Sequence, residues 1–212
     1  MKHPDPRLRA YCDLVVAEPV SVTAVRDPAA AWDVLVEDAL TAVAVVRELA
    51  PADAVDVGSG GGSPGIPLAL VLGLPVTLLE ATGTKCRFLE RAAAALHAPC
   101  TVVHARSEEY GRGEGRDRFP AAFARALAPP PVAAELVLPL VAAGGAAILW
   151  TGALVDDDAL ADTAALVGGA VEAVHEAAAG RRLVVLRKVA ATPERFPRRP
   201  GIARARPLVP ST

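Results

Sequence analysis

Short apolar runs alternate with helical segments along most of the chain. Runs dominated by Val, Leu, Ala and Ile predict strands at 54–57, 76–80, 100–105, 121–126, 146–150, 170–176 and 181–188. Helices are predicted between them, at 66–72, 85–97, 131–141 and 156–167. Strands that alternate with helices indicate an α/β protein with a parallel, doubly wound sheet.

Both ends of the chain depart from this alternation. Residues 6–50 read as helical with a break at "EPVSVTAVRDP" (18–28), and the second helix has an apolar side that includes Trp32 and Leu35. The last two strands are joined by "AAAG" (177–180) without a helix, so they should pair antiparallel and add a reversed edge to the sheet. From Ala190 the chain is rich in Pro and Arg, and we expect it to be extended.

These patterns predict one domain in three parts. Residues 1–50 form an N-terminal helical segment, 51–189 a ligand-binding domain, and 190–212 a basic tail that belongs to the same domain. Hydrophobic residues make up 52% of the 212 residues, enough for a large core. The charged N-terminus lacks the apolar stretch of a signal peptide, and the apolar segment 132–150 is interrupted by Glu135 and Pro139, so no membrane span is expected.

Charge and metal-binding residues exclude several classes of function. A net charge of −2 and 4% aromatic residues argue against binding nucleic acid through bulk charge or many stacking platforms, though not against a local basic face. The three cysteines lie far apart and the four histidines have no ligand spacing, which predicts no metal and no disulfide framework. A reduced, cytoplasmic protein fits this pattern best.

The stretch "DVGSGGGSPGIP" (56–67) links the first predicted strand to the next helix. In an open α/β sheet, ligands bind beyond the carboxyl ends of the strands, where glycines let the backbone approach them closely. Gly60, Gly62 and Gly65 match the dinucleotide pattern G-x-G-x-x-G, but so glycine-rich a run would satisfy many patterns. Asp56 would repel a pyrophosphate and attract a cation, which favours S-adenosylmethionine over a nicotinamide dinucleotide, with Asp56, Gly58 and Gly60 at the cofactor.

Two further positions suit a nucleoside. Glu80 ends the second strand about 20 residues later, where an acid takes the ribose hydroxyls of either cofactor. Ser107 and Glu108 follow the third strand, where such folds bind the adenine edge. The alternative for Glu108 is a solvated loop acid.

Several stretches together resemble the GidB/RsmG family of bacterial methyltransferases, which modify N7 of one guanine in 16S ribosomal RNA. They are "DVGSGGGSPGIPLAL", "TLLEATGTKCRFLERA", "VVHARSEEY", "ARALAPPPVAAELVLPLVAAGG", "RRLVVLRK" and "TPERFPRRPGIARARPL", and the resemblance covers 20–208. It implies a Rossmann-like class I methyltransferase fold with a mostly parallel seven-stranded sheet, an antiparallel edge strand and N-terminal helices. It also implies cofactor contacts from Gly58, Ser63, Ser107, Glu108 and Arg125, with Glu80 on the ribose.

The sequence departs from the family pattern near the expected substrate side. An Asn is replaced by Ser21, an Arg-His pair by Val34 and Leu35, a Lys-Arg pair by Thr84-Lys85, and a Ser by Ala124, while Asp38 is kept. These changes remove polar groups, so the cofactor is better supported than the substrate.

The resemblance implies chemistry that needs no general base. Guanine N7 carries an in-plane lone pair and no proton, so catalysis would rest on alignment and on tolerance of positive charge. Arg125, at the end of the fourth strand, is the candidate catalytic residue that orients cofactor or base; a surface ion pair is the alternative. "APPP" (128–131) lacks the acid and aromatic of amino-group methyltransferases, and Cys100, which starts a strand, is expected to be a buried core thiol and not a nucleophile.

The tail supplies a candidate RNA-binding strip. Seven basic residues and the single acid Glu194 lie between Arg187 and Arg206, and Lys85 and Arg87 could add to them. The proposed RNA contacts are Lys85, Arg87, Arg198, Arg199 and Arg204; the alternative is a solvated tail. The expected partner is 16S ribosomal RNA or the small ribosomal subunit, bound by a monomer.

Two other functions stay open. A methyltransferase of the same fold could act on another RNA or on a small molecule, as Val34, Leu35, Thr84 and Ala124 suggest. A non-catalytic ribosome-binding module is the third reading, against which the intact glycine turn and Glu80 argue.

Overall fold

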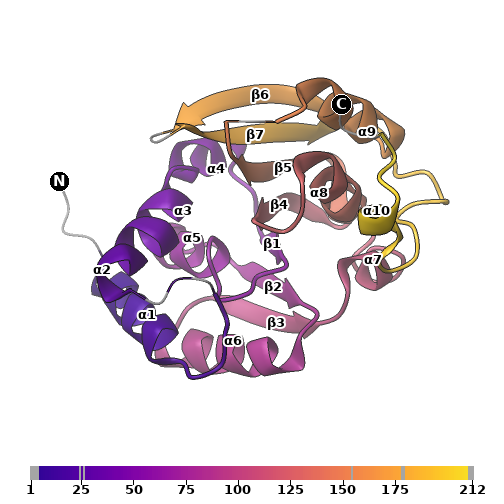
Figure 1. Cartoon of the computed structure of the whole chain (residues 1–212). Coiled ribbons are helices and arrows are strands. Elements are labelled where there is room, and N and C mark those ends of the chain that lie inside the picture. The colour runs from indigo at the N-terminus through magenta and orange to yellow at the C-terminus, as the bar shows by residue number, and fades with distance from the viewer. Residues whose placement is uncertain (1–4, 24, 26, 154, 178–179, 210–212) are drawn as a thin grey trace. The chain divides into compact units, whose positions relative to one another are not determined.

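The computed structural model describes residues 5–23, 25, 27–153, 155–177 and 180–209 (Figure 1). The chain divides into two compact units, Met1–His104 and Ala105–Thr212. Some predicted parts lie partly outside the described residues. They are the outer ends of the N-terminal segment and of the tail, and the centre of the "AAAG" link. Within the described residues, no helix is both long enough and apolar enough to span a membrane.

The first unit contains a three-stranded parallel sheet in the order β3-β2-β1. Its strands are β1 (Ala54–Val57), β2 (Val76–Glu80) and β3 (Cys100–His104). The first two have the predicted bounds, because each is an apolar run whose side chains are almost all buried. Helices α5 (Gly65–Leu72) and α6 (Gly83–Ala95) follow β1 and β2, and α6 packs along β2 and β3 (Figure 1).

The N-terminal helices differ from the single second helix that the sequence predicts. After α1 (Pro6–Ala17) the chain forms α2 (Pro28–Ala31), a π-helix η1 (Trp32–Glu37), α3 (Asp38–Leu40) and α4 (Val43–Leu49). The predicted break between the first two helices is confirmed, and Asp5 and Asp27 cap α1 and α2 by accepting from backbone N–H groups. Helices α1 and α3 pack against α5.

The second unit contains strands in the order β4-β5-β7-β6. They are β4 (Phe119–Arg125), β5 (Val141–Thr151), β6 (Gly169–Ala177) and β7 (Arg181–Lys188). The last two strands pair antiparallel, as predicted. The reversed strand is β7, which also pairs antiparallel with β5, so β6 lies at the margin of the unit and points the same way as β5.

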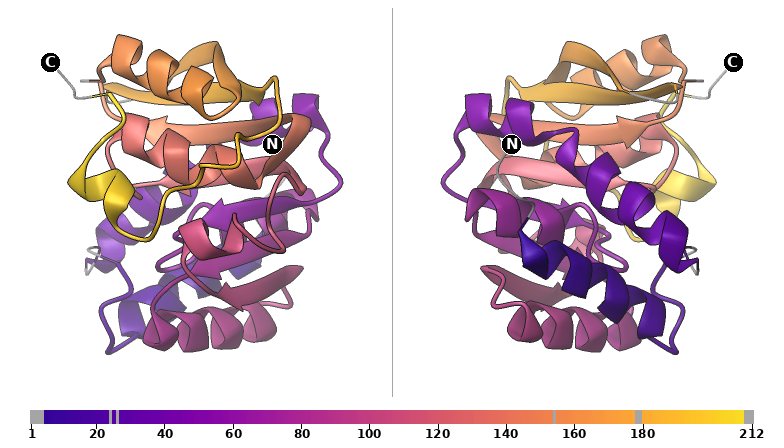
Figure 2. Two further views of the ribbon diagram at one scale, coloured as in Figure 1. Left: turned by 90° about the vertical axis from the view of Figure 1, so that its right-hand side faces the viewer. Right: turned by 90° about the vertical axis from the view of Figure 1, so that its left-hand side faces the viewer.

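The second unit also contains helices, the last of which lies within the tail. They are α7 (Ser107–Tyr110), α8 (Pro130–Val137), the 3-10 helix η2 (Leu138–Leu140), α9 (Asp157–Leu166) and α10 (Ile202–Ala205). Helices α8 and α9 lie side by side, α8 against β4 and β5 and α9 against β6 (Figure 2). Asp156 caps α9 by accepting from Ala159 N at 2.9 Å, as its position suggests.

The prediction of an extended tail is wrong. The chain after Ala190 carries the helical turn α10, and residues distant in sequence bind its backbone. Lys188, just before the tail, is almost fully buried, and its Nζ donates to Asp117 Oδ1 (2.6 Å), Leu138 O (2.7 Å) and Thr192 Oγ1 (2.5 Å). Burial lowers the pKa of Lys188, while the hydrogen bond and charge of Asp117 oppose this shift.

Replacing Asp117 with Asn should destabilise the protein by about 2–3 kcal/mol at pH 7. Removing one partner of a buried ion pair leaves an uncompensated charge, and the cost lies below that of a fully buried pair because Asp117 is 26% exposed. Without the carboxylate the pKa of Lys188 falls further, so the deficit should shrink as pH rises toward the ordinary lysine pKa of about 10.4 and the buried amine becomes neutral.

Urea unfolding at several pH values checks this expectation. The exposed Asp162→Asn variant on α9 is the matched control and should change stability by less than about 0.5 kcal/mol. A deficit for Asp117→Asn that stays constant or grows with pH would contradict the account of Lys188.

Candidate functional site

The glycine turn after β1 is built on backbone conformations that favour glycine. Gly58, Gly60 and Gly62 have φ values of +72°, +55° and +97°. Gly58 N donates to Leu79 O at 2.8 Å, and Ser59 N donates to the same carbonyl at 3.2 Å. The turn is therefore attached to the carboxyl end of β2.

Glu80, the last residue of β2, fastens this attachment with its side chain. Its Oε2 accepts from Gly60 N at 3.0 Å and its Oε1 accepts from Thr82 N at 2.8 Å. The residue is only 7% exposed, so two backbone donors fix a carboxylate that is largely shielded from solvent. Each oxygen keeps a second lone pair, which fits the expected bonds to a ribose diol.

Asp56 lies beneath the turn and is 1% exposed. Its Oδ2 accepts from Gly65 N, the first residue of α5, at 3.2 Å, and so stabilises the start of this helix. Its negative charge also reaches Cys100: burial and Asp56 together raise the pKa of the Cys100 thiol to about 12. Because Asp56 is buried, we expect it to attract a cationic cofactor through its charge at a distance. This role stays a prediction.

The N-terminal helices support the turn from outside, which sequence reasoning missed. Tyr11 of α1 is fully buried, and its hydroxyl donates to Gly61 O at 2.9 Å. Ser63 Oγ donates to Leu35 O in the π-helix at 2.8 Å, and a Cβ added at Gly60 would lie 3.4 Å from Val22 O. A single Tyr in an amphipathic helix carries no local signal of such a contact.

In the second unit, Ser107 and Glu108 form the first turn of α7. Glu108 is 6% exposed, so it is not a solvated loop acid. Its Oε2 accepts from Ser107 Oγ at 3.3 Å, and its Oε1 accepts from Gly201 N at 3.0 Å. The bond to the tail was not foreseen.

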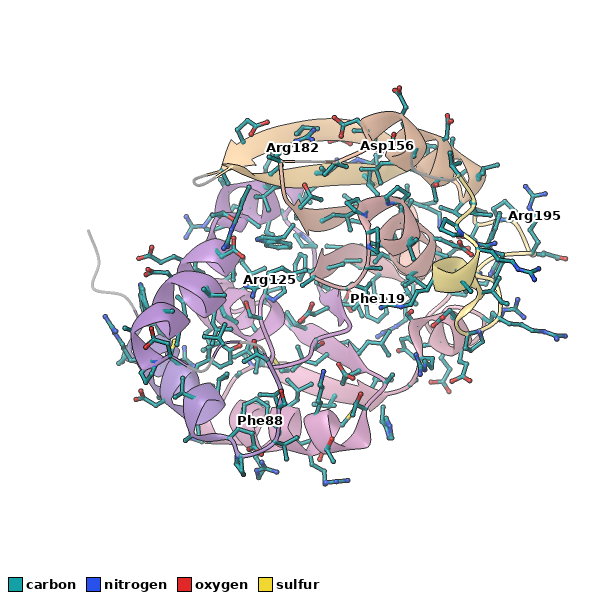
Figure 3. All side chains as sticks on the ribbon, in the orientation of Figure 1. Phe88, Phe119, Arg125, Asp156, Arg182 and Arg195 are labelled. Atoms are coloured by element: carbon teal, nitrogen blue, oxygen red, sulfur yellow. The ribbon has the colours of Figure 1, made fainter. Side chains whose placement is uncertain are left out.

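Arg125 is the last residue of β4 and is half-buried (Figure 3). It is followed by Ala126, whose φ of +53° turns the chain sharply at the carboxyl end of the strand. This is the position in which the sequence places it.

The candidate RNA contacts fall into two groups. Lys85 and Arg87 lie in the first turns of α6, the former half-buried and the latter exposed. In the tail, Arg199 is exposed, whereas Arg198 forms an ion pair with Glu135 and Arg204 Nη2 donates to Leu127 O at 2.5 Å.

The structure thus brings together predicted residues within each unit. Asp56, Gly58, Gly60, Ser63 and Glu80 gather at the glycine turn of the first, and Ser107 and Glu108 join the tail in the second. Cys100 starts β3 as predicted, but it is half-buried and not enclosed in the core, because β3 lies at the edge of its sheet. Across the described residues, no group of three or more His, Cys, Asp or Glu side chains is placed to hold a metal ion.

Replacing Gly65 with Ala should weaken binding of S-adenosylmethionine more than about tenfold and destabilise the protein by about 1–3 kcal/mol. The added Cβ would lie 2.6 Å from Leu78 Cδ2 and 2.7 Å from Asp56 Oδ2, so the turn and α5 must shift. Gly73→Ala is the matched control: it meets no atom within 4 Å, and its φ of +63° should cost about 1–2 kcal/mol without affecting binding. Calorimetric titration and thermal unfolding measure both effects, and equal losses of affinity in the two variants would contradict the role assigned to the turn.

Comparison with known proteins identifies the family. The family model for GidB, rRNA small subunit methyltransferase G, matches residues 6–185. Two relatives named ribosomal RNA small subunit methyltransferase G are similar over most of their length. The protein from Carboxydothermus hydrogenoformans is 40% identical over 79% of this chain and 76% of its own, and that from Chloroflexus aggregans is 36% identical over 98% and 91%.

A solved structure agrees on the fold. A mutant of MtNAS in complex with S-adenosylmethionine has a TM-score of 0.60 at 17% identity, over 87% of this chain and 73% of that one. The predicted Rossmann-like, mostly parallel seven-stranded fold is therefore confirmed. With the family match covering more than half of its length, the chain belongs to the rRNA small subunit methyltransferase G (GidB) family.

Proposed function

We propose that this protein transfers a methyl group from S-adenosylmethionine to N7 of one guanine in 16S ribosomal RNA, by direct in-line attack without a general base. The family establishes the coarser statement, which is S-adenosylmethionine-dependent methylation of small-subunit ribosomal RNA. The observation that carries the finer proposal is the end of β4: Arg125 is followed by Ala126–Pro129, which include neither acid nor aromatic side chain.

The residues at the glycine turn fit this cofactor. Three alternate glycines with positive φ leave the backbone open to close approach, and Glu80 presents a fixed carboxylate at the end of the adjacent strand. The buried charge of Asp56 favours a cation above the turn. When bound, S-adenosylmethionine supplies an electrophilic methyl group on a sulfonium.

The chain's own task is then alignment and charge stabilisation. Guanine N7 attacks with an in-plane lone pair and sheds no proton, so no residue needs to act as base. Holding the reacting atoms in line can contribute up to about 7–11 kcal/mol. We assign Arg125 to orienting the base or cofactor, since it ends the strand at whose carboxyl edge such folds bind ligands.

Cys100 is unsuited to act as a nucleophile, which supports direct methyl transfer without a covalent enzyme intermediate. Its thiol, with a pKa of about 12, is almost entirely neutral at pH 7. It also starts β3, whereas Glu80 pairs with His104 at the other end of that strand. A cytosine C5 mechanism, which needs a thiolate near the cofactor, is therefore disfavoured.

Val34 and Leu35 favour a second candidate, a methyltransferase of the same fold that acts on another RNA or a small molecule. Both lie in the π-helix, and Leu35 is 1% exposed, so its side chain serves packing and does not present a polar group to a substrate. In either case we propose a monomer that acts in the cytoplasm.

The rate of the methyl-transfer step should stay constant between about pH 6.5 and pH 8.5. A general base would make the rate rise with pH below the pKa of that base. Single-turnover measurements under saturating cofactor test this, and a tenfold rise per pH unit within the range would contradict a mechanism without a base.

The site of methylation is tested with labelled S-adenosylmethionine and small subunits from a strain that lacks this gene. We expect label in 16S ribosomal RNA at one guanine, located by chain cleavage at N7-methylguanine. Arg125→Lys should lower the rate at least about tenfold, since a planar, bidentate guanidinium is replaced by a point charge. Label at another base or atom would overturn the proposal, and no label in any ribosomal RNA, with cofactor bound, would favour the second candidate.

A further inference from the structure

The C-terminal strap, residues 190–206, is held onto the second unit by side chains from earlier in the chain. Arg112 Nε donates to Pro197 O at 2.7 Å. Arg116 donates to Phe196 O at 2.8 Å and to Thr192 O at 2.5 Å. Two guanidinium groups thus take up backbone carbonyls of the strap, which fixes its course despite its Pro-rich sequence.

The middle of the strap is anchored by a buried acid. Arg198 Nε and Nη2 bind Glu135 Oε1 and Oε2 at 2.7 and 2.5 Å, a bidentate pair in which Glu135 is 1% exposed and Arg198 23%. Five residues on, Ala203 packs in an apolar cluster with Val132 and Leu136 of α8. The strap therefore has both a polar and an apolar anchor on the same helix.

A further hydrogen bond connects the strap to Glu108, which we expect at the cofactor. Gly201 N, at the start of α10, donates to Glu108 Oε1 at 3.0 Å. Glu108 is the acid that we expect at the adenine edge. The strap is thus fixed beside a residue of the proposed active site.

Other arginines of the strap face solvent. Arg195, Arg199 and Arg206 are exposed, and within the described part of the chain no carboxylate pairs with them. The guanidinium of Arg195 lies over the ring of Phe196, 5.0 Å from its centroid, and its side chain lies at the outer margin of the second unit (Figure 3). The guanidinium groups of these arginines are therefore available to bind anions from solution.

We propose that the docked strap is the surface that binds the RNA backbone, with Arg195 and Arg199 contacting phosphates and Arg198 acting as a positioning residue through Glu135. The proposal rests on ribosomal RNA as the substrate. The proposal separates the basic residues of the strap by their burial. An arginine that is already bound to a buried carboxylate cannot move to a phosphate without leaving that carboxylate buried and unpaired. Exposed arginines on a fixed backbone bind with less ordering cost than those of a flexible tail.

The phosphate contacts are tested by the salt dependence of binding to a fluorescent fragment of 16S ribosomal RNA. Each phosphate contact that is lost should reduce the slope of log K against log salt by about 0.7–0.9. We expect this reduction, with weaker binding, for Arg195→Gln and for Arg199→Gln. Arg47→Gln, an exposed arginine on α4, is the control and should leave both quantities unchanged. Slopes in all three variants that equal the slope of the unaltered protein would overturn the proposal.

The role of Arg198 is tested by a variant with opposite expectations. If Arg198 itself bound phosphate, Glu135→Gln would release its guanidinium and strengthen RNA binding. If Arg198 positions the strap, Glu135→Gln loosens the strap and weakens binding at least about threefold. Arg198→Lys keeps the charge but loses the bidentate geometry, so it should also weaken binding. Unchanged or tighter binding in both variants would overturn the positioning role.

The same variants separate this proposal from the proposed function. Methylation at N7 of guanine by the unaltered protein tests the function alone. RNA affinity and salt slope, measured without cofactor, test the strap alone. Correct methylation with equal slopes would therefore reject the strap while leaving the function intact.

Discussion

The carboxylate of Glu80 is the constraint on which the candidate site depends. It accepts from Gly60 in the glycine turn and from Thr82 before α6, so one buried side chain fixes the loops at the ends of two adjacent strands. Hydrogen bonds to a charged group contribute about 1.5–3 kcal/mol each, enough to hold three left-handed glycines in one conformation. The turn that we propose as the nucleoside site is therefore held in one conformation by the chain itself.

The same device recurs in the second unit. Glu108 holds the start of α10 through Gly201, and Glu135 holds the strap through Arg198. All three glutamates are at least nine-tenths buried and satisfied by the chain itself. In this largely Ala- and Val-built protein, buried acids place the loops and the apolar strands supply the frame.

Local sequence patterns predicted the strands whose central side chains are buried. Strands 54–57, 76–80 and 181–188 have the expected bounds, since each contains consecutive apolar residues whose side chains are buried in the structure. The glycine turn and Glu80 were also predictable, because glycine spacing and an acid at a strand end are sequence features. The docked tail, the buried Tyr11 and the Glu135–Arg198 pair were not, since each depends on residues about 50 or more positions away. The π-helix was missed because its pattern of buried positions does not differ visibly from that of an α-helix.

Calorimetric titration of Glu80→Gln with S-adenosylmethionine tests the central claim most directly. Glutamine has one acceptor where the carboxylate has two, so either Gly60 N or Thr82 N loses its partner and the proposed ribose site is no longer fixed. Affinity should fall at least about tenfold, or 1.4 kcal/mol, while Glu90→Gln on the exposed side of α6 should bind as the unaltered protein does. A folded Glu80→Gln variant with unchanged affinity would contradict the claim that this carboxylate organises the site.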